Sequence, residues 1–272
     1  LFQVSFPIVV SMFIQSMYNL VDSYYIGKIN EDAFTAISIA FPIQNIMIGI
    51  AVGTGVGMNS LISRYLGEKN YEKSNRTAET GLALAIIYGI ILLILSRFLP
   101  RPFLSAQTTD ENIIAYGIEY LEIVMGFSMG VFIQIFLERT LQSTGRSVFT
   151  MLTQLIGAVL NIILDPIFIF GYFGLPAMGV KGAAVATVTG QIIGALCGCF
   201  FEYKFNEEIT IKKPVLDLDI VKGIYVVGVP SMITITIQSF TIYVLNKMLS
   251  AISTSAIAAL GAYFKVQSFV FM

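Results

Sequence analysis

The sequence contains no histidine and only two cysteines among its 272 residues. Without histidine, and with no paired motif for metal or nucleophile chemistry, an enzyme is the functional class that the sequence favours least. Cys197 and Cys199 lie inside an apolar run, where neither a disulfide framework nor a four-ligand metal site can be assembled. We therefore expect a protein that is not an enzyme and has no cofactor.

Charge is also scarce. Only 12% of the residues are charged, 56% are hydrophobic and the mean hydropathy is +0.80, which excludes a soluble domain with a polar surface. The net charge is −1 and the basic residues are scattered through loops, so no basic face indicates a nucleic-acid partner. Membrane lipids are the expected surroundings of the chain.

Long apolar runs dominate the sequence instead. A helix that crosses a bilayer needs roughly 20 mostly apolar residues, and eight segments meet this condition or are cut off while meeting it: 4–27, 36–63, 78–99, 113–137, 148–171, 180–203, 221–249 and 255–272. The sequence thus predicts an all-α polytopic membrane protein. Its first segment is as long as the later ones and its last residue falls inside an apolar run, so we expect a span rather than a signal peptide at the start, and a longer natural protein.

The basic residues predict the orientation, because cytoplasmic loops carry an excess of Lys and Arg. Ten lie on one side of the predicted membrane: Arg64, Lys69, Lys73, Arg76, Arg139, Arg146, Lys204, Lys212, Lys213 and Lys222. Five lie on the other side, namely Lys28, Arg97, Arg101, Lys181 and Lys247, and Lys265 falls in the last helix. This distribution predicts a cytoplasmic N-terminus.

Three predicted spans carry small residues four positions apart, a spacing that lets helix backbones approach one another in lipid. They are Gly49, Gly53 and Gly57; Gly126 and Gly130; and Gly182, Ala186, Gly190, Gly194 and Gly198. We interpret all three stripes as packing surfaces without chemistry.

An internal repeat appears when the chain is shifted by 223 residues, which lays the seventh predicted span on the first. This shift pairs Pro7 with Pro230 and Gln15 with Gln238. Chance matching between apolar helices is the alternative. A true repeat predicts three parts in a parent of twelve helices: a six-helix lobe at 1–205, a cytoplasmic linker at 206–219, and the first two helices of a second lobe at 220–272. Parallel six-helix repeats are typical of transporters, whose substrate path runs between the halves.

Two acidic residues, Asp22 and Asp165, fall inside predicted spans at similar depth. An ionisable residue there costs about 2.5 to 3.5 kcal/mol on insertion scales, so each is a functional hypothesis. Asn161 lies one turn before Asp165, and Pro166 frees a backbone carbonyl. With the Thr187 hydroxyl from the next span, these oxygens suit a hard cation or a carboxylate pair that shares a proton.

Alternatives remain for these polar residues. Asp22 can lie in the membrane interface beside Tyr24, and Asp165 can cap the end of a kinked helix. Five glutamines in spans either line a cavity or bond neighbouring helices: Gln15, Gln44, Gln134, Gln154 and Gln238.

Three sequence blocks resemble the multidrug and toxic compound extrusion transporters. Residues 21–27 read Val-Asp-Ser-Tyr-Tyr-Ile-Gly after an early proline, residues 161–166 read Asn-Ile-Ile-Leu-Asp-Pro, and residues 182–187 read Gly-Ala-Ala-Val-Ala-Thr. The resemblance implies two six-helix lobes around a central cleft, with extrusion driven by Na⁺ or H⁺. It also implies that the coupling ion, Na⁺ included, binds at Asp22, Asn161, Asp165 and Thr187.

The same resemblance implies antiport by alternating access, with amphipathic, mostly cationic drugs as substrates. We expect a substrate cavity formed by Gln15, Tyr18, Gln44 and Gln238, and helix kinks at Pro7 and Pro166. Some members of the family have an acidic residue where this chain has Gln238, which puts an ion site in the second lobe in doubt. The expected form is a monomer in the plasma membrane of a prokaryote.

The nearest alternative is a flippase of a lipid-linked precursor, which shares this architecture. A pyrophosphate cargo needs basic residues inside the cleft, whereas every Lys and Arg except Lys265 lies near an end of a predicted span. A channel is a further alternative, although a repeat with asymmetric acids fits a carrier better.

Overall fold

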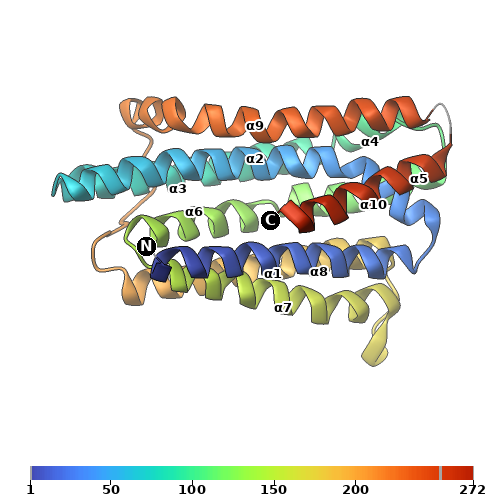
Figure 1. Cartoon of the computed structure of the whole chain (residues 1–272), viewed down its shortest axis with the longest axis horizontal. Coiled ribbons are helices and arrows are strands. Elements are labelled where there is room, and N and C mark those ends of the chain that lie inside the picture. The colour runs from blue at the N-terminus through green and yellow to red at the C-terminus, as the bar shows by residue number, and fades with distance from the viewer. Residues whose placement is uncertain (1, 251–252, 272) are drawn as a thin grey trace.

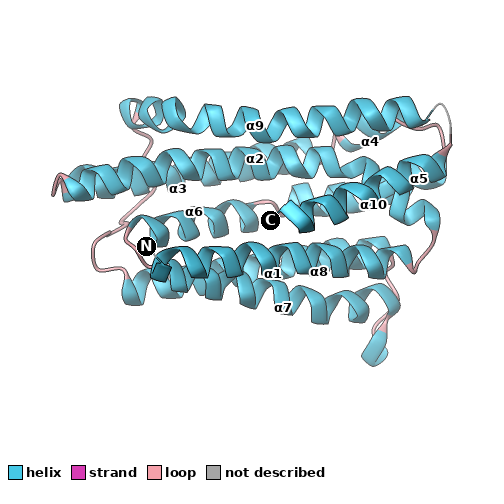
Figure 2. Ribbon diagram, in the orientation of Figure 1, coloured by secondary structure: helices cyan, strands magenta, loops and turns pink. Residues whose placement is uncertain are grey.

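The computed structural model describes residues 2–250 and 253–271, and its regular elements are all helices (Figure 2). In chain order they are α1 (Phe2–Gly27), α2 (Glu31–Gly67), α3 (Tyr71–Leu95), α4 (Pro100–Ser105), α5 (Glu111–Gly126), α6 (Met129–Ser143), α7 (Ser147–Phe170), the 3₁₀ turn η1 (Tyr172–Gly174), α8 (Val180–Phe205), α9 (Leu218–Ser250) and α10 (Thr254–Phe271). Most of these helices run along the long axis of the molecule as one bundle (Figure 1).

The predicted all-α membrane architecture is confirmed. Among the described residues, α2, α3, α7, α8 and α9 are each long and apolar enough to cross a membrane, and the bent pair α5 and α6 makes a sixth. The two further predicted spans, 4–27 and 255–272, are helical as α1 and α10. Residue 272 lies outside the described residues.

The fourth predicted span is broken, although its apolar run predicts one continuous helix. Helices α5 and α6 meet at an angle of 47°. At the break, the N–H of Ser128 bonds to the carbonyl of Met125 at 3.2 Å, and the N–H of Gly130 bonds to that of Phe127 at 3.1 Å. Bonds to the third preceding residue tighten the helix locally and turn its axis. The break aims α6 at the interior of the bundle, where it contacts α2, α3, α7 and α8.

Polar side chains fix where several helices begin. The Asn30 carboxamide accepts a hydrogen bond from Ala33 N at 2.7 Å at the start of α2, and Asn70 does the same for Lys73 N at 3.1 Å at the start of α3. These caps satisfy backbone donors that the first turn of a helix leaves without partners. They explain why α2 and α3 begin before the apolar runs that predicted them.

The glycine stripe of α2 packs against α9. A methyl group at Gly53 would lie 3.0 Å from the carbonyl oxygen of Gly228, and a methyl group at Gly49 would lie 3.0 Å from Ile235. A methyl group at Gly57 would overlap the backbone carbonyl of Ile224. The stripe therefore allows backbone contact between the two helices, as the packing interpretation expects.

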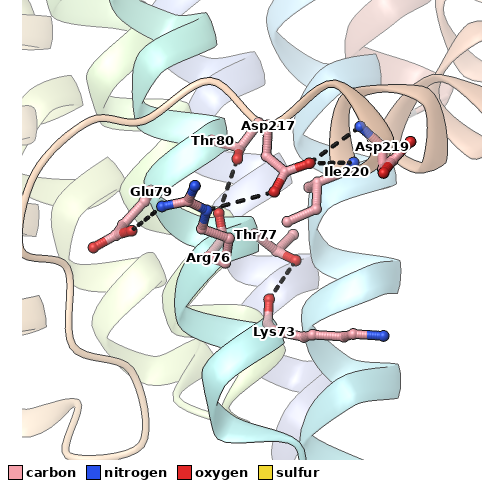
Figure 3. A network of polar contacts seen from close by, with 8 residues as sticks. All are labelled: Lys73, Arg76, Thr77, Glu79, Thr80, Asp217, Asp219 and Ile220. Carbon is pink, nitrogen blue, oxygen red and sulfur yellow. Dashed lines mark hydrogen bonds and ion pairs between the residues drawn. The ribbon is translucent and has the colours of Figure 1, made fainter.

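The segment between α8 and α9 lies on the first turns of α3 (Figure 3). Arg76 on α3 pairs with Asp217 at 3.5 Å and with Glu79 at 3.8 Å. Asp217 also accepts hydrogen bonds from Asp219 N at 3.1 Å and Ile220 N at 3.4 Å, so it caps the start of α9. This residue links the beginning of α9 to α3.

Candidate functional site

Helix α7 lies between α1 and α8 and carries two of the predicted site residues. Close packing at Gly157 and Gly190 makes this possible, because a methyl group at Gly190 would lie 2.7 Å from the Gly157 carbonyl oxygen. The close approach brings Thr187 on α8 next to Asn161 on α7.

All four predicted ion-site residues are buried. The exposed fraction is 7% for Asp22, 2% for Asn161, 0% for Asp165 and 4% for Thr187. Asp22 comes from α1 and lies close enough to Asp165 to interact with it electrostatically. The structure therefore brings together two carboxylates that are far apart in the sequence.

The Asn161 carboxamide connects this group. With the amide assigned so that its oxygen faces Thr187, its nitrogen donates to Asp165 Oδ2 at 3.2 Å, and its oxygen accepts from the backbone N–H of Thr187 at 3.1 Å and from the Thr187 hydroxyl at 3.3 Å. This orientation satisfies both ends of the amide, whereas the reverse one would turn the amide oxygen toward the Asp165 carboxylate, so that two acceptors face each other. The group presents carboxylate oxygens in a buried setting, a donor set that suits a hard cation or a proton.

Both predicted kink residues lie inside helices, Pro7 in α1 and Pro166 in α7. The Ser11 hydroxyl donates to the Pro7 carbonyl at 2.9 Å. A proline within a helix removes one backbone donor, and each position is therefore a point at which its helix can bend.

A cavity of about 120 Å³ opens beside the acidic group, large enough for several water molecules. Five helices line it, through Gln15 and Tyr18 (α1), Ile48 and Val52 (α2), Val131, Gln134, Ile135, Glu138 and Arg139 (α6), Gln154, Gly157, Ala158 and Asn161 (α7), and Thr187, Gly190 and Gln191 (α8). Asn161 and Thr187 thus belong both to the acidic group and to the cavity wall.

The predicted substrate residues divide into two pairs. Gln15 and Tyr18 line the cavity, and Tyr18 also lies within electrostatic range of both carboxylates of the acidic group. Gln44 instead accepts a hydrogen bond from the Tyr120 hydroxyl at 3.4 Å, and Gln238 is exposed on α9. Neither of the second pair is among the residues that line this cavity.

The sequence prediction was wrong about Arg139. It was assigned to a loop beyond a span ending at residue 137, but α6 continues to Ser143 and Arg139 lines the cavity. Arg139 does lie within the last turns of α6, as a residue near a span end should, but this position does not keep it out of the cavity. The charges of Glu138 and Arg139 interrupt the apolar run, and the partners of Glu138 on α7, Thr153 and Gln154, cannot be read from local hydropathy.

Glu138 is a site residue that the sequence analysis missed. Its side chain is 5% exposed and accepts hydrogen bonds from Gln134 Nε2 at 3.0 Å, Gln154 Nε2 at 2.8 Å and the Thr153 hydroxyl at 3.5 Å. The glutamines at 134 and 154, four and sixteen residues away, were the available signal, because both are polar residues in predicted spans. They bond to a buried acid as well as lining a cavity.

Residues 7–167, more than half of the chain, match the MatE family. The chain belongs to the MatE family. Its members are transporters and not enzymes, so the expectation that the chain is not an enzyme is confirmed.

Among the relatives of this MatE chain, the probable multidrug resistance protein YoeA of Bacillus subtilis is 28% identical over 272 residues, which are 98% of this chain and 59% of YoeA. The multidrug export protein MepA of Staphylococcus aureus (strain MRSA252) is 27% identical over 268 residues, which are 97% of this chain and 58% of MepA. The chain therefore spans a little under three fifths of the length of these curated relatives.

Solved structures of MATE transporters have the same fold. The MATE multidrug transporter DinF-BH, solved as a complex, is 29% identical with a TM-score of 0.88, over 98% of this chain and 60% of that one. A MATE family transporter of the MOP superfamily is 25% identical in both an inward-facing and an outward-facing conformation, with TM-scores of 0.84 and 0.85. These alignments cover 97% and 98% of this chain, and 61% and 59% of the solved chains.

Proposed function

We propose that this MatE chain is part of a cation-coupled antiporter that exports amphipathic, mostly cationic organic compounds by alternating access, with Na⁺ or H⁺ as the coupling ion. The observation that carries the proposal is the buried group of Asp22, Asn161, Asp165 and Thr187, which adjoins a cavity between five helices. Two carboxylates in a membrane helix bundle are costly unless a cation or a proton joins them.

In the proposed cycle, a cation or proton from outside binds between Asp22 and Asp165. Binding changes the charge at one end of the cavity, where Asn161 and Thr187 form part of the wall. The ion and the substrate then favour different conformations, and the ion gradient shifts the population toward substrate release. A bend of α1 at Pro7 is the proposed movement.

The proposal includes the organisation of the chain. Residues 1–205 form the first lobe, 206–219 the cytoplasmic linker, and 220–272 the beginning of a second lobe. The protein acts as a monomer in the plasma membrane with its N-terminus in the cytoplasm, and it takes small organic molecules and membrane lipids as partners, not nucleic acid.

The test is efflux of a fluorescent cationic dye from cells that express the protein as it occurs naturally, with and without a Na⁺ or H⁺ gradient. We expect gradient-driven efflux in the wild type and its loss in Asp165→Asn, which keeps the shape of the side chain but not its charge. Glu119→Gln is the matched control, because Glu119 is an exposed acid on α5. Wild-type efflux in Asp165→Asn would remove this carboxylate from the coupling mechanism.

A flippase of a lipid-linked precursor is the second candidate, and Arg139 in the cavity wall is the observation that favours it. A pyrophosphate would take several such cations, however, and Glu138 beside Arg139 opposes an anionic cargo. Absence of dye efflux from the wild type, combined with loss of lipid-linked precursor transfer in Arg139→Gln, would support the flippase instead.

A further inference from the structure

The cavity holds a second charged group, which lies away from the proposed coupling site. Glu138 and Arg139 both line it from α6, and Glu138 bonds to Gln154 on α7 at 2.8 Å. Gln154 and Asp165 are eleven residues apart on one helix, so a rise of 1.5 Å per residue separates them by about 16 Å. Glu138 and Arg139 therefore line the end of the cavity that lies away from Asn161 and Thr187, the two cavity residues that belong to the acidic group.

Glu138 and Arg139 interact electrostatically, but their side chains do not form a direct ion pair. Arg139 Nη1 donates to Gln142 Oε1 at 2.9 Å, while the Glu138 carboxylate accepts from Gln134, Gln154 and Thr153. Consecutive residues on a helix point about 100° apart, which explains why each charge has its own neutral partners. Among the ion pairs of the described residues, none joins these two side chains.

Among the described residues, buried hydrogen-bond donors and acceptors without partners surround Glu138 and Arg139. The amide oxygens of Gln154 and Gln191 are buried acceptors without a partner in the described part of the chain, and Arg139 Nε is a buried donor in the same situation. All three residues line the cavity. Buried polar groups of this kind are regularly satisfied by a ligand or by water.

The charges of Glu138 and Arg139 determine which kind of ligand this end of the cavity binds most tightly. Glu138 and Arg139 together contribute no net charge, so a simple monocation is attracted by one and repelled by the other. A molecule with an ammonium group and a carboxylate can place its ammonium near Glu138 and the amide oxygens, and its carboxylate near the Arg139 guanidinium. Each charge of the ligand then meets a side chain of opposite charge in the cavity wall.

We propose that the Glu138–Arg139 end of the cavity is a recognition site for amphipathic zwitterions, with Glu138 binding the ammonium group and Arg139 binding the carboxylate. This inference rests on the proposed function and narrows its cargo from organic cations in general. The Asp22–Asp165 group remains available for the coupling ion while the cargo is bound.

The experiment measures binding of three dansyl probes to the purified protein in lipid nanodiscs, read from the dansyl emission. ε-Dansyl-lysine carries both charges at the amino-acid end of a flexible chain, so this end can enter the cavity of about 120 Å³ while the dansyl ring stays outside it. Its methyl ester keeps only the ammonium group, and its Nα-acetyl derivative keeps only the carboxylate. We expect the wild type to bind the zwitterion about tenfold more tightly than either derivative, because each derivative lacks the charge that would pair with Glu138 or with Arg139.

Two variants test which residue binds the ammonium group of the ligand and which binds its carboxylate. Glu138→Gln should bind the zwitterion and the acetyl derivative equally, and Arg139→Gln should bind the zwitterion and the methyl ester equally. Arg64→Gln, at an exposed arginine paired with Glu68, is the matched control and should keep the wild-type preference. The comparison of probes on the wild type holds even if a variant does not fold.

Equal binding of all three probes to the wild type would overturn the inference, as would a preference for the zwitterion that survives in both variants. Binding needs no ion gradient, so it separates this inference from the proposed function. Coupled dye efflux without a zwitterion preference would remove only the recognition site. A zwitterion preference that Glu138→Gln and Arg139→Gln abolish, without any coupled efflux, would keep the site and remove the transport proposal.

Discussion

Thr187 shows at the scale of one residue how the proposed coupling site is held. Its hydroxyl and its backbone N–H both donate to the Asn161 carboxamide, whose nitrogen bonds to Asp165. We predict that Thr187→Val, which keeps the shape but removes the hydroxyl, costs about 1 kcal/mol and weakens the apparent affinity for the coupling cation about fivefold. The dependence of dye efflux on cation concentration measures this. Thr189→Val is the control, because the Thr189 hydroxyl donates to the Val185 carbonyl of its own helix. An equal loss in both variants would contradict the prediction.

The sequence predicts residues at this scale only where the signal is local or belongs to a known pattern. Asn161 and Asp165 are one helical turn apart, and an acid within an apolar span is conspicuous. Glu138 was missed because it directly follows the apolar run that defined its span, so that it resembled a loop residue. Its donor Gln154 is on another helix, and only the packing of α6 against α7 makes a buried carboxylate acceptable there.

At the scale of the element, Asp217 both caps α9 and pairs with Arg76 on α3. We predict that Asp217→Ala lowers stability by about 1 kcal/mol, mostly through loss of the cap, since the pair with Arg76 is partly exposed. Asp217→Asn should lose little, because asparagine caps as well as aspartate. Thermal unfolding in detergent measures the difference, with Asp219→Asn as the control in the same turn. Equal destabilisation by both substitutions at 217 would show that the charge and not the cap is what matters.

The close contact between α2 and α9 depends on the absence of a side chain at Gly57. A methyl group there would overlap the Ile224 carbonyl, so Gly57→Ala has to push the two helices apart. We predict a loss of about 1 to 3 kcal/mol, measured by thermal unfolding, which is typical of overpacking at a tight contact. Gly67→Ala, at the open end of the same helix with nothing within 4 Å, should not destabilise the protein. Wild-type stability in Gly57→Ala would mean that α2 and α9 are not held at this distance.

At the scale of the whole molecule, helix number and type follow from hydropathy because lipid forces each span to satisfy its own backbone. The eight predicted spans correspond to α1, α2, α3, the pair α5 and α6, α7, α8, α9 and α10. The break in the fourth span was not predicted, because no proline marks it, although Gly126, Ser128 and Gly130 at the break are residue types at which helices kink. The 223-residue repeat stays a prediction, because only the first two helices of a second unit are present to compare with the first.

Orientation is the remaining property of the whole molecule that the sequence predicts, and it can be tested directly. Helix α8 runs from the α7–α8 connection to the α8–α9 linker, so these two segments lie at opposite ends of the bundle (Figure 1). The linker contains Lys212 and Lys213, and basic residues are retained in the cytoplasm. In a background without Cys197 and Cys199, we therefore predict that Leu175→Cys in the α7–α8 connection reacts with a membrane-impermeant maleimide on intact cells.

Lys213→Cys should react with the same reagent only after the membrane is permeabilised. Both positions are exposed, so access to the reagent and not burial decides the outcome. The parent without cysteine provides the background signal. Labelling of Lys213→Cys but not Leu175→Cys on intact cells would invert the topology, and it would place the Glu138–Arg139 end of the cavity toward the outside. The excess of basic residues on the linker side would then reflect contacts such as Arg76 with Asp217 rather than retention in the cytoplasm.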